Sequence, residues 1–353
     1  MLSLSLRCAL EREVVGQPRP LNTIVRSVTV ALAGLAETES PLGIYLFVGP
    51  SGTGKTHMAQ SVARLLHGDP RKLVVADCIQ MAGRDEWSAL PSQLAPSFRH
   101  PAPGHAGSVL AMAPLSILLV EHLEWARPEI VQALVAALET GYLMLPDGKC
   151  GSLGGCLVLM TSNLCAREIY DAGRSEIGFS PAQEIEETEK ARIYQLVSTA
   201  AEKQWGSDLL AHLDDLLVFH RLREGHLPFI LRRLLVGLNQ QLAPRRISCG
   251  IDAQVERYLI ARGARFLRQG AWVLVKVFRR FVLFPMADLV HGGRLQPGSR
   301  VLVTLDSGDR LRFSVIKEEE TPAEFLAEVE RPFGVPVEWD ERTLASDAGR
   351  GAP

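Results

Sequence analysis

The sequence predicts an α/β fold, in which a parallel sheet is covered by helices and is followed by a small, mainly helical subdomain with a terminal β-hairpin. Short uninterrupted apolar runs alternate with helical patterns in the first part of the chain, which is typical of strands buried in a parallel sheet. From about residue 186 to 290 the pattern is almost wholly helical. Residues 301–316 then alternate apolar and polar side chains around Ser-Gly-Asp, as a hairpin does.

Four apolar runs are expected to form the buried strands, and each has the length of a strand. They are residues 43–48, 73–76, 117–120 and 156–160. Apolar residues at helical spacing within 10–36, behind a turn at 16–20, predict a helix that leads into the core. A second helix is expected between the first strand and about Leu66.

Length and charge favour a globular protein of two or three domains. The chain has 353 residues, 47% of them hydrophobic, with 38 Lys and Arg against 40 Asp and Glu. This balance is evidence against binding nucleic acid through bulk positive charge, so we expect no nucleic-acid partner. The apolar start, Met-Leu-Ser-Leu-Ser-Leu, is too short for a signal-peptide core or a membrane span. We therefore expect a cytoplasmic protein that does not bind membranes, with its six scattered cysteines reduced.

Residues 49–56 match the phosphate-binding motif GxxxxGK[ST] in full, between a predicted strand and a predicted helix. The motif consists of Gly49, Pro50, Ser51, Gly52, Thr53, Gly54, Lys55 and Thr56. In such a loop, backbone amides face a phosphate, the lysine supplies positive charge, and the hydroxyl can bind Mg²⁺. The sequence therefore predicts binding of a nucleoside triphosphate with Mg²⁺, and Thr56 is a candidate metal ligand.

Five further segments resemble the second ATPase module of the Clp class of AAA+ unfoldases and disaggregases. They match, in order, the family's opening signature, Walker B segment, sensor 1 strand, arginine-finger segment and sensor 2 helix: residues 14–17, 121–129, 159–164, 213–219 and 270–274. The order and spacing agree over about residues 10–315. The resemblance implies a large nucleotide-binding subdomain at 1–185, extending to about 222, and a small lid at 223–317. An acidic tail with prolines follows at 318–353.

The resemblance also implies roles for single residues. Val15 would lie near the adenine, and Asn163, at sensor 1, would contact the γ-phosphate or its water. ATP and Mg²⁺ would be the cofactors. The protein would form a ring oligomer and act on or with protein partners.

The Walker B positions depart from the family pattern. Members of the family carry an aspartate that orients the Mg²⁺ shell, followed by a glutamate that polarises the attacking water; here these positions are Glu121 and His122. A shifted register would make Glu121 the catalytic acid, but it breaks the ungapped match through Glu124 and Pro128, so we prefer the first. Glutamate can still reach a metal, whereas a histidine side chain is a poor replacement for a carboxylate. Glu124 is an alternative acid, although relatives carry a glutamate there without this use.

The two positions for arginine also differ. The arginine-finger position is His212 and the sensor 2 position is Trp272. A guanidinium grips phosphate with two parallel hydrogen bonds, which neither replacement can do, and an arginine finger alone can be worth about 10³–10⁵ in rate. Arginines at 221, 223, 279 and 280 are alternatives, although solvated helix faces explain them as well. Hydrolysis is therefore expected to be slow or absent.

The family's pore loop, which holds extended polypeptide, would fall between residues 77 and 115. The segment 104–107 keeps two glycines around His105, and 95–98 keeps an aromatic residue, Phe98, without the glycines. Neither segment is a clean match.

Two functions follow from these observations. The first is an ATP-binding pseudo-ATPase that uses nucleotide to set its conformation and assembly, beside an active relative in a mixed ring. The alternative is an active, ATP-hydrolysing unfoldase. A DNA-processing AAA+ protein is disfavoured, because neither the charge balance nor a helix-turn-helix signal supports it.

Overall fold

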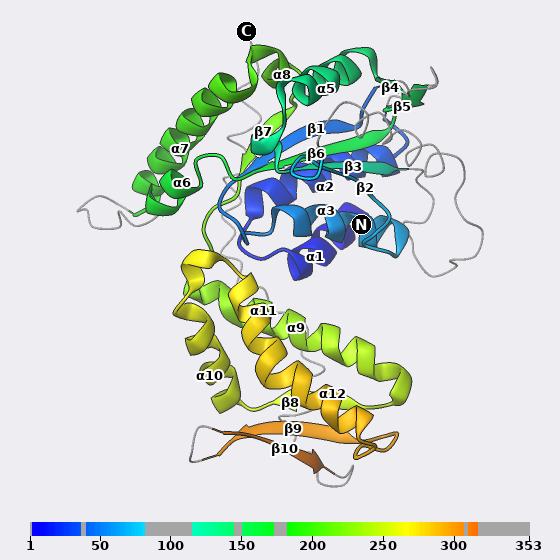
Figure 1. Ribbon diagram of the computed structural model, residues 1–353, viewed down its shortest axis with the longest axis vertical. Helices are drawn as coiled ribbons and strands as arrows, with labels where there is room; N and C mark the ends of the chain where they lie inside the picture. The colour runs from blue at the N-terminus through cyan, green and yellow to red at the C-terminus, as the bar shows by residue number, and fades with distance from the viewer. Residues whose placement is uncertain are drawn as a thin grey trace.

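The computed structural model describes residues 2–36, 40–81, 115–144, 150–172, 182–306 and 310–316. Two units follow each other along the chain (Figure 1). We call residues 2–222 the large unit and residues 223–316 the small unit. The expected pore-loop segments at 95–98 and 104–107 and the acidic tail at 318–353 lie outside the described residues.

A five-stranded parallel sheet forms the centre of the large unit, with the strand order β2-β3-β6-β1-β7. The strands are β1 (Gly43–Val48), β2 (Val74–Asp77), β3 (Ser116–Glu121), β6 (Cys156–Ser162) and β7 (Asp215–Val218). Four of them confirm the predicted buried strands. The fifth, β7, was not predicted, because its apolar run is short and lies in a region with a helical pattern. The α/β fold class is confirmed.

Helices cover both faces of this sheet (Figure 1). One face carries α1 (Leu2–Glu13), α2 (Pro18–Leu32) and α3 (Lys55–His67); the other carries α5 (Pro128–Thr140), α6 (Ala166–Ala172), α7 (Ala182–Trp205) and α8 (Ser207–Ala211). Successive side chains of a strand point to opposite faces. Thus Tyr45 and Phe47 of β1 pack in the core beneath α1 to α3, whereas Leu46 and Val48 pack in the core beneath α5 and α7. The predicted leading helix is α2, while α1 was not predicted.

Short elements complete the large unit. They are a hairpin of β4 (Tyr142–Met144) and β5 (Cys150–Ser152) and a 3₁₀ helix, η1 (Leu123–Trp125), directly after β3. The free thiols with described side chains are Cys8, Cys78, Cys156, Cys165 and Cys249. Within the described residues, no helix has the length and apolar character needed to span a membrane.

The small unit packs four helices and a three-stranded sheet around its own core. The helices are α9 (Leu227–Leu242), α10 (Ala253–Ala264), α11 (Trp272–Phe278) and α12 (Phe284–His291), and the strands are β8 (Ser248–Ile251), β9 (Arg300–Leu305) and β10 (Leu311–Ile316). The short helical turns are η2 (Glu224–His226), η3 (Ala243–Arg245), η4 (Leu267–Gln269) and η5 (Arg279–Leu283). The predicted hairpin is β9 and β10. The segment before the hairpin, predicted to be almost wholly helical, also contains the unpredicted strand β8, which pairs in parallel with β9.

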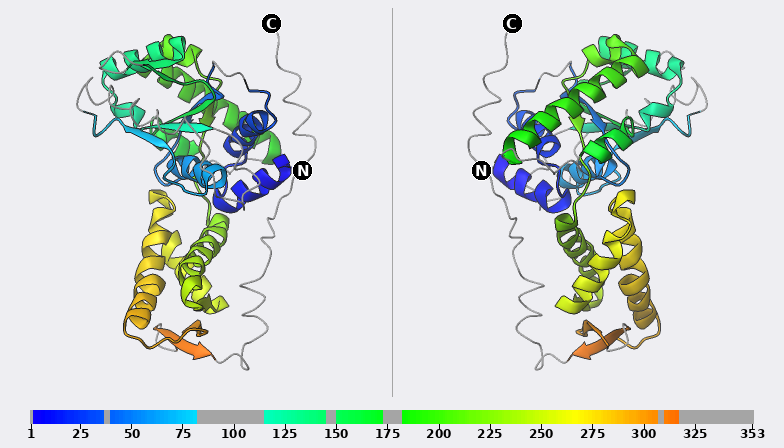
Figure 2. Two further views of the ribbon diagram at one scale, coloured as in Figure 1. Left: turned by 90° about the vertical axis from the view of Figure 1, so that its right-hand side faces the viewer. Right: turned by 90° about the vertical axis from the view of Figure 1, so that its left-hand side faces the viewer.

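The two units meet beside the phosphate loop, with α9 and α11 next to α1 and α3 in both orientations of Figure 2. Buried Gln17 joins three segments at this junction. Its Nε2 donates to the carbonyl oxygens of Thr53 (3.2 Å) and His220 (2.9 Å), and its Oε1 accepts from the His220 amide (3.1 Å). The turn before α2 therefore positions both the phosphate loop and the chain that leads into the small unit.

Candidate nucleotide-binding site

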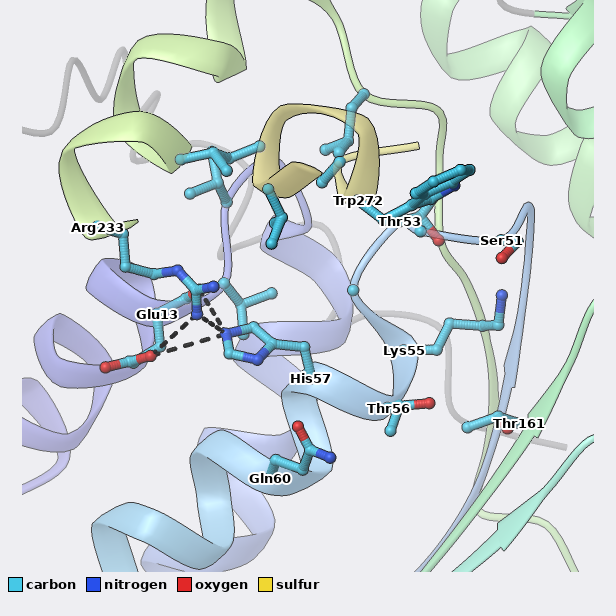
Figure 3. A pocket seen from close by; sticks show the side chains of 18 of the residues that line it. Glu13, Ser51, Thr53, Lys55, Thr56, His57, Gln60, Thr161, Arg233 and Trp272 are labelled. Carbon is cyan, nitrogen blue, oxygen red and sulfur yellow. Dashed lines mark hydrogen bonds and ion pairs between the residues drawn. The ribbon is translucent and has the colours of Figure 1, made fainter. Parts of the chain in front are cut away.

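A pocket of about 370 Å³ lies between the units, at the carboxyl ends of the sheet strands. Its lining comes from the phosphate loop, the segment after α1, the start of α3, the ends of β3 and β6, and the small unit (Figure 3). The residues that line it are Glu13, Val14, Val15, residues 51–57, Gln60, His122, Thr161, Asn163, Leu222, Ile230, Arg233, Ala271, Trp272 and Val275. Both units thus contribute walls to one cavity.

The phosphate loop needs glycine at positions where the backbone turns sharply. Gly52 (φ +74°) and Gly54 (φ +107°) lie in the left-handed region, which side chains other than glycine rarely adopt. A Cβ atom at Gly49 would lie 2.3 Å from the carbonyl oxygen of Phe219. Thr53 closes the loop by donating from Oγ1 to the Pro50 carbonyl at 2.8 Å. The loop then leads directly into α3, whose first backbone amides are available to an anion.

Lys55 is buried and its ammonium group is held by oxygens of the protein. Its Nζ donates to the carbonyls of Gly49 (2.6 Å) and Pro50 (2.9 Å) and to Oδ1 of Asn163 (3.0 Å). Burial lowers the pKa of Lys55 to about 8, an effect that nearby Glu124 opposes. An anionic ligand here would satisfy a desolvated cation, so the loop is chemically suited to phosphate.

Glu121 ends β3 next to Thr56, and the Thr56 hydroxyl donates to Glu121 Oε1 at 2.5 Å. The two predicted metal ligands are therefore neighbours. A hydroxyl and a carboxylate are hard oxygen donors of the kind that Mg²⁺ prefers, and the donor set fits this ion.

His122 has left-handed backbone geometry (φ +58°) and lies on the pocket wall. Its Nδ1 is 3.1 Å from Oδ1 of Asp77, at the end of β2. Because a carboxylate only accepts hydrogen bonds, Nδ1 carries the proton in this contact. Sequence reasoning missed Asp77; its signal was an acidic residue directly after an apolar strand.

Asn163 and Glu124 continue the polar network from Lys55. Asn163 donates from Nδ2 to Glu124 Oε1 at 2.9 Å, while it accepts from Lys55 through Oδ1. The other carboxylate oxygen of Glu124 is buried and has no hydrogen-bond partner among the described residues. The sensor 1 position thus links the phosphate loop to the alternative acid.

The two positions that would carry arginine lie in different places. Trp272, at the start of α11, lines the pocket, with the Lys276 ammonium 3.8 Å from its ring centre. His212 is not among the residues that line this pocket, and its Nε2 is 3.7 Å from Oε1 of Glu139 on α5. The other predicted site residues that line the pocket are Val15, residues 51–56, His122 and Asn163.

Sequence reasoning missed a charged cluster at the end of the pocket away from Asn163, which we call the Glu13 cluster (Glu13, His57, Arg64 and Arg233). Glu13 Oε2 accepts from Nη1 of Arg64 (2.8 Å) and from Nη1 of Arg233 (3.3 Å). Arg233 also contacts Nε2 of His57 through the same nitrogen. His57 directly follows the phosphate motif, but nothing in the sequence connects it with residues 13 and 233.

Comparison with known proteins identifies the family of this chain. The model of the AAA domain (Cdc48 subfamily) matches residues 40–215. The chain is 25% identical over 325 residues to the ATP-dependent Clp protease ATP-binding subunit ClpC of Staphylococcus aureus (strain USA300), covering 91% of this chain and 39% of ClpC. It is 27% identical over 327 residues to the chaperone protein ClpB of Agrobacterium fabrum, covering 93% of this chain and 35% of ClpB. The chain belongs to the Clp class of AAA+ proteins.

A solved structure supports the same fold for this Clp-class module. Hsp104 in a closed state with ATPγS and FITC-casein superimposes with a TM-score of 0.67 at 21% identity, over 88% of this chain and 51% of that chain. The match covers less than two fifths of the ClpC chain and of the ClpB chain. Membership in this class implies that the module binds nucleotide.

Proposed function

We propose that this Clp-class module binds ATP and uses the bound nucleotide to set its conformation and its assembly with protein partners, with little or no hydrolysis. One observation carries the proposal. A complete phosphate loop with Lys55 and Thr56 lines the same pocket as His122 and Trp272, which replace the carboxylate and the arginine expected there. The groups suited to holding a triphosphate are present, while those suited to cleaving it are changed.

Binding of ATP without hydrolysis can still stabilise one conformation of the protein. A ligand that binds only the folded, closed form stabilises it by about 2.7 kcal/mol at a hundredfold excess over Kd. Because both units line the pocket, ATP would favour the arrangement in which they are joined.

Mg²⁺ would be held by Thr56 and Glu121, whose side chains are already in contact. The chemistry that Mg²⁺ would supply there is neutralisation of the negative charge on the phosphates. The longer side chain of Glu121 would hold the metal in place of the usual aspartate.

We further propose a cytoplasmic ring assembly that includes protein partners, such as an active AAA+ relative in a mixed ring, without nucleic acid or membrane. In such a ring His212 would face a neighbouring nucleotide. Its position away from the pocket of its own chain is compatible with that role.

The contact between His122 and Asp77 favours a second candidate, an active motor with an unusual base. A carboxylate that accepts from Nδ1 orients the imidazole and leaves Nε2 able to take a proton from water. On this alternative, steady hydrolysis would depend on His122, and an unfoldase activity would remain.

ATP titration followed by a turnover assay tests the proposal. We expect the wild-type protein to bind ATP and Lys55→Ala to weaken binding by at least about a hundredfold. Turnover should stay far below the common enzyme value of about 10 s⁻¹. Rapid turnover that is lost in His122→Ala and unchanged in Glu124→Gln would instead support the histidine-assisted motor.

A gain-of-function variant tests the reason given for slow hydrolysis. Restoring the family pattern with Glu121→Asp, His122→Glu and Trp272→Arg together should raise turnover by at least about a hundredfold, because a base and a charge-stabilising arginine each contribute that much or more. A matched control is Trp272→Arg alone, which should have a smaller effect. Equal turnover of the triple variant and the wild type, both with ATP bound, would contradict the assignment of these positions.

A further inference from the structure

One cationic side chain of the small unit reaches the pocket from α9 rather than from the expected sensor 2 position on α11. Arg233 lines the pocket opposite Lys55 and Thr161 (Figure 3). It is anchored in the large unit through Glu13 on α1 and His57 on α3. We propose that Arg233 is a nucleotide-binding residue, which contacts the ribose and α-phosphate of the nucleotide and so couples the small unit to its presence. This inference rests on the proposed binding of ATP.

The position of Arg233 along the pocket assigns the part of the nucleotide that it would contact. Lys55, Thr161 and Asn163 mark the end where the terminal phosphates would lie, because Lys55 belongs to the phosphate loop. His57, which Arg233 contacts, is the next residue after Thr56 in the first turn of α3. The apolar side chains of Val15 and Ile230 line the pocket in the neighbouring segments of the same two units. Arg233 therefore lies beyond the phosphate loop, toward the sugar.

The contacts within the Glu13 cluster fix the guanidinium of Arg233 in a position from which it can donate to a ligand. Arg233 contacts Glu13 and His57 through Nη1, so its other nitrogens can donate to a ligand. Ribose hydroxyls and phosphate oxygens are acceptors that a guanidinium recognises. A group fixed before binding loses less entropy on binding than a mobile one.

The charge of the Glu13 cluster also favours an anion. Two guanidinium groups, of Arg64 and Arg233, share the single carboxylate of Glu13. The cluster thus keeps a net positive charge at the pocket wall, although Glu13 itself would repel phosphate.

Affinities for ATP and ADP, measured by calorimetry on the full chain, test this assignment. Arg233→Gln should weaken both nucleotides by the same factor, about tenfold, because the ribose and α-phosphate are common to both. Arg232→Gln is the matched control: it removes the adjacent arginine of α9, which does not line the pocket. It should leave both affinities within about twofold of the wild type.

Three outcomes would overturn the assignment. They are wild-type affinities in Arg233→Gln, an equal loss in Arg232→Gln, or a loss confined to ATP, which would assign Arg233 to the γ-phosphate. Thermal unfolding without nucleotide checks that both variants fold; if Arg233→Gln does not, Arg233→Lys keeps the charge but loses the planar fork and should still weaken both nucleotides equally. A folded wild-type protein that binds neither nucleotide would refute the proposed function as well.

Discussion

Lys55 already donates to two carbonyls of its own loop and to Asn163. A triphosphate must therefore replace protein acceptors before it meets the ammonium group. The side chains that differ from the family pattern, His122 and Trp272, lie on the wall of the pocket that the phosphate loop also lines. Under the proposed function, these two substitutions would separate ATP binding from ATP cleavage.

His57 gives a prediction for the pH dependence of stability. Its pKa is lowered from the ordinary 6.5 to about 4, chiefly by burial, and its side chain is 26% exposed. Between these values the unfolded chain binds more protons than the folded one, so the free energy of unfolding should fall as the pH is lowered from 6.5 toward 4, by at most about 3 kcal/mol. Urea unfolding at pH 7, 6 and 5, without nucleotide or Mg²⁺, measures this change.

The matched variant is His57→Gln, which cannot titrate. Its unfolding free energy should change less over the same pH range, because the contribution of His57 is removed. Equal pH slopes for the variant and the wild type would show that His57 is not the group responsible.

Among the elements, the strands with continuous apolar runs were predictable, whereas the short strands β4, β5, β7 and β8 were not. The sequence of β8, Ser-Cys-Gly-Ile, has no continuous apolar run that would predict a strand. Its backbone is held from outside: Asn239 on α9 donates to the Cys249 carbonyl (2.9 Å) and accepts from the Cys249 amide (2.7 Å). A strand that depends on a side chain ten residues away cannot be predicted from its own residues.

Asn239→Ala should therefore lower the free energy of unfolding by about 2–3 kcal/mol, because it leaves two buried backbone groups of β8 without a partner. Chemical denaturation measures the loss. Gln240→Ala, at the next and exposed position of α9, is the control and should change stability by less than about 0.5 kcal/mol. Similar losses in the two variants would contradict the role given to Asn239.

At the scale of the whole molecule, the phosphate loop is in direct backbone contact with the small unit. The Ala271 amide donates to the Gly52 carbonyl at 3.0 Å, and a Cβ at Gly270 would lie 2.5 Å from the Ser51 carbonyl oxygen. The loop that would bind phosphate is thus also a docking point for α11. Nucleotide binding at the loop would therefore affect the position of the small unit.

Gly270→Ala should disrupt the contact between the start of α11 and the phosphate loop. We expect faster amide hydrogen exchange in the first turn of α11 and ATP affinity reduced by about tenfold, because the backbone of the loop or of the small unit must move. Gly298→Ala is the control, since Gly298 has a similar φ (+94° against +90°) but no atom within 4 Å of the added Cβ. Exchange and affinity that change equally in both variants would indicate backbone strain rather than the contact.

The candidate site was predictable where its residues are contiguous in sequence. The phosphate loop and the segment from Glu121 to Glu124 carry local patterns that sequence reasoning can find. The pairs Asp77–His122 and Glu13–Arg233 join residues that are far apart in the chain, through long-range packing of strands and of the two units. The sequence around each of these residues does not indicate which residue it pairs with.

The measurement that tests the central claim most directly is the identity of the bound nucleotide over time. The purified protein would be incubated with excess ATP and Mg²⁺, freed of unbound nucleotide, and denatured at intervals to release what it holds. The account predicts that nucleotide is retained and remains ATP for hours. A folded protein that retains no nucleotide, or one whose ATP becomes ADP within seconds, would contradict it.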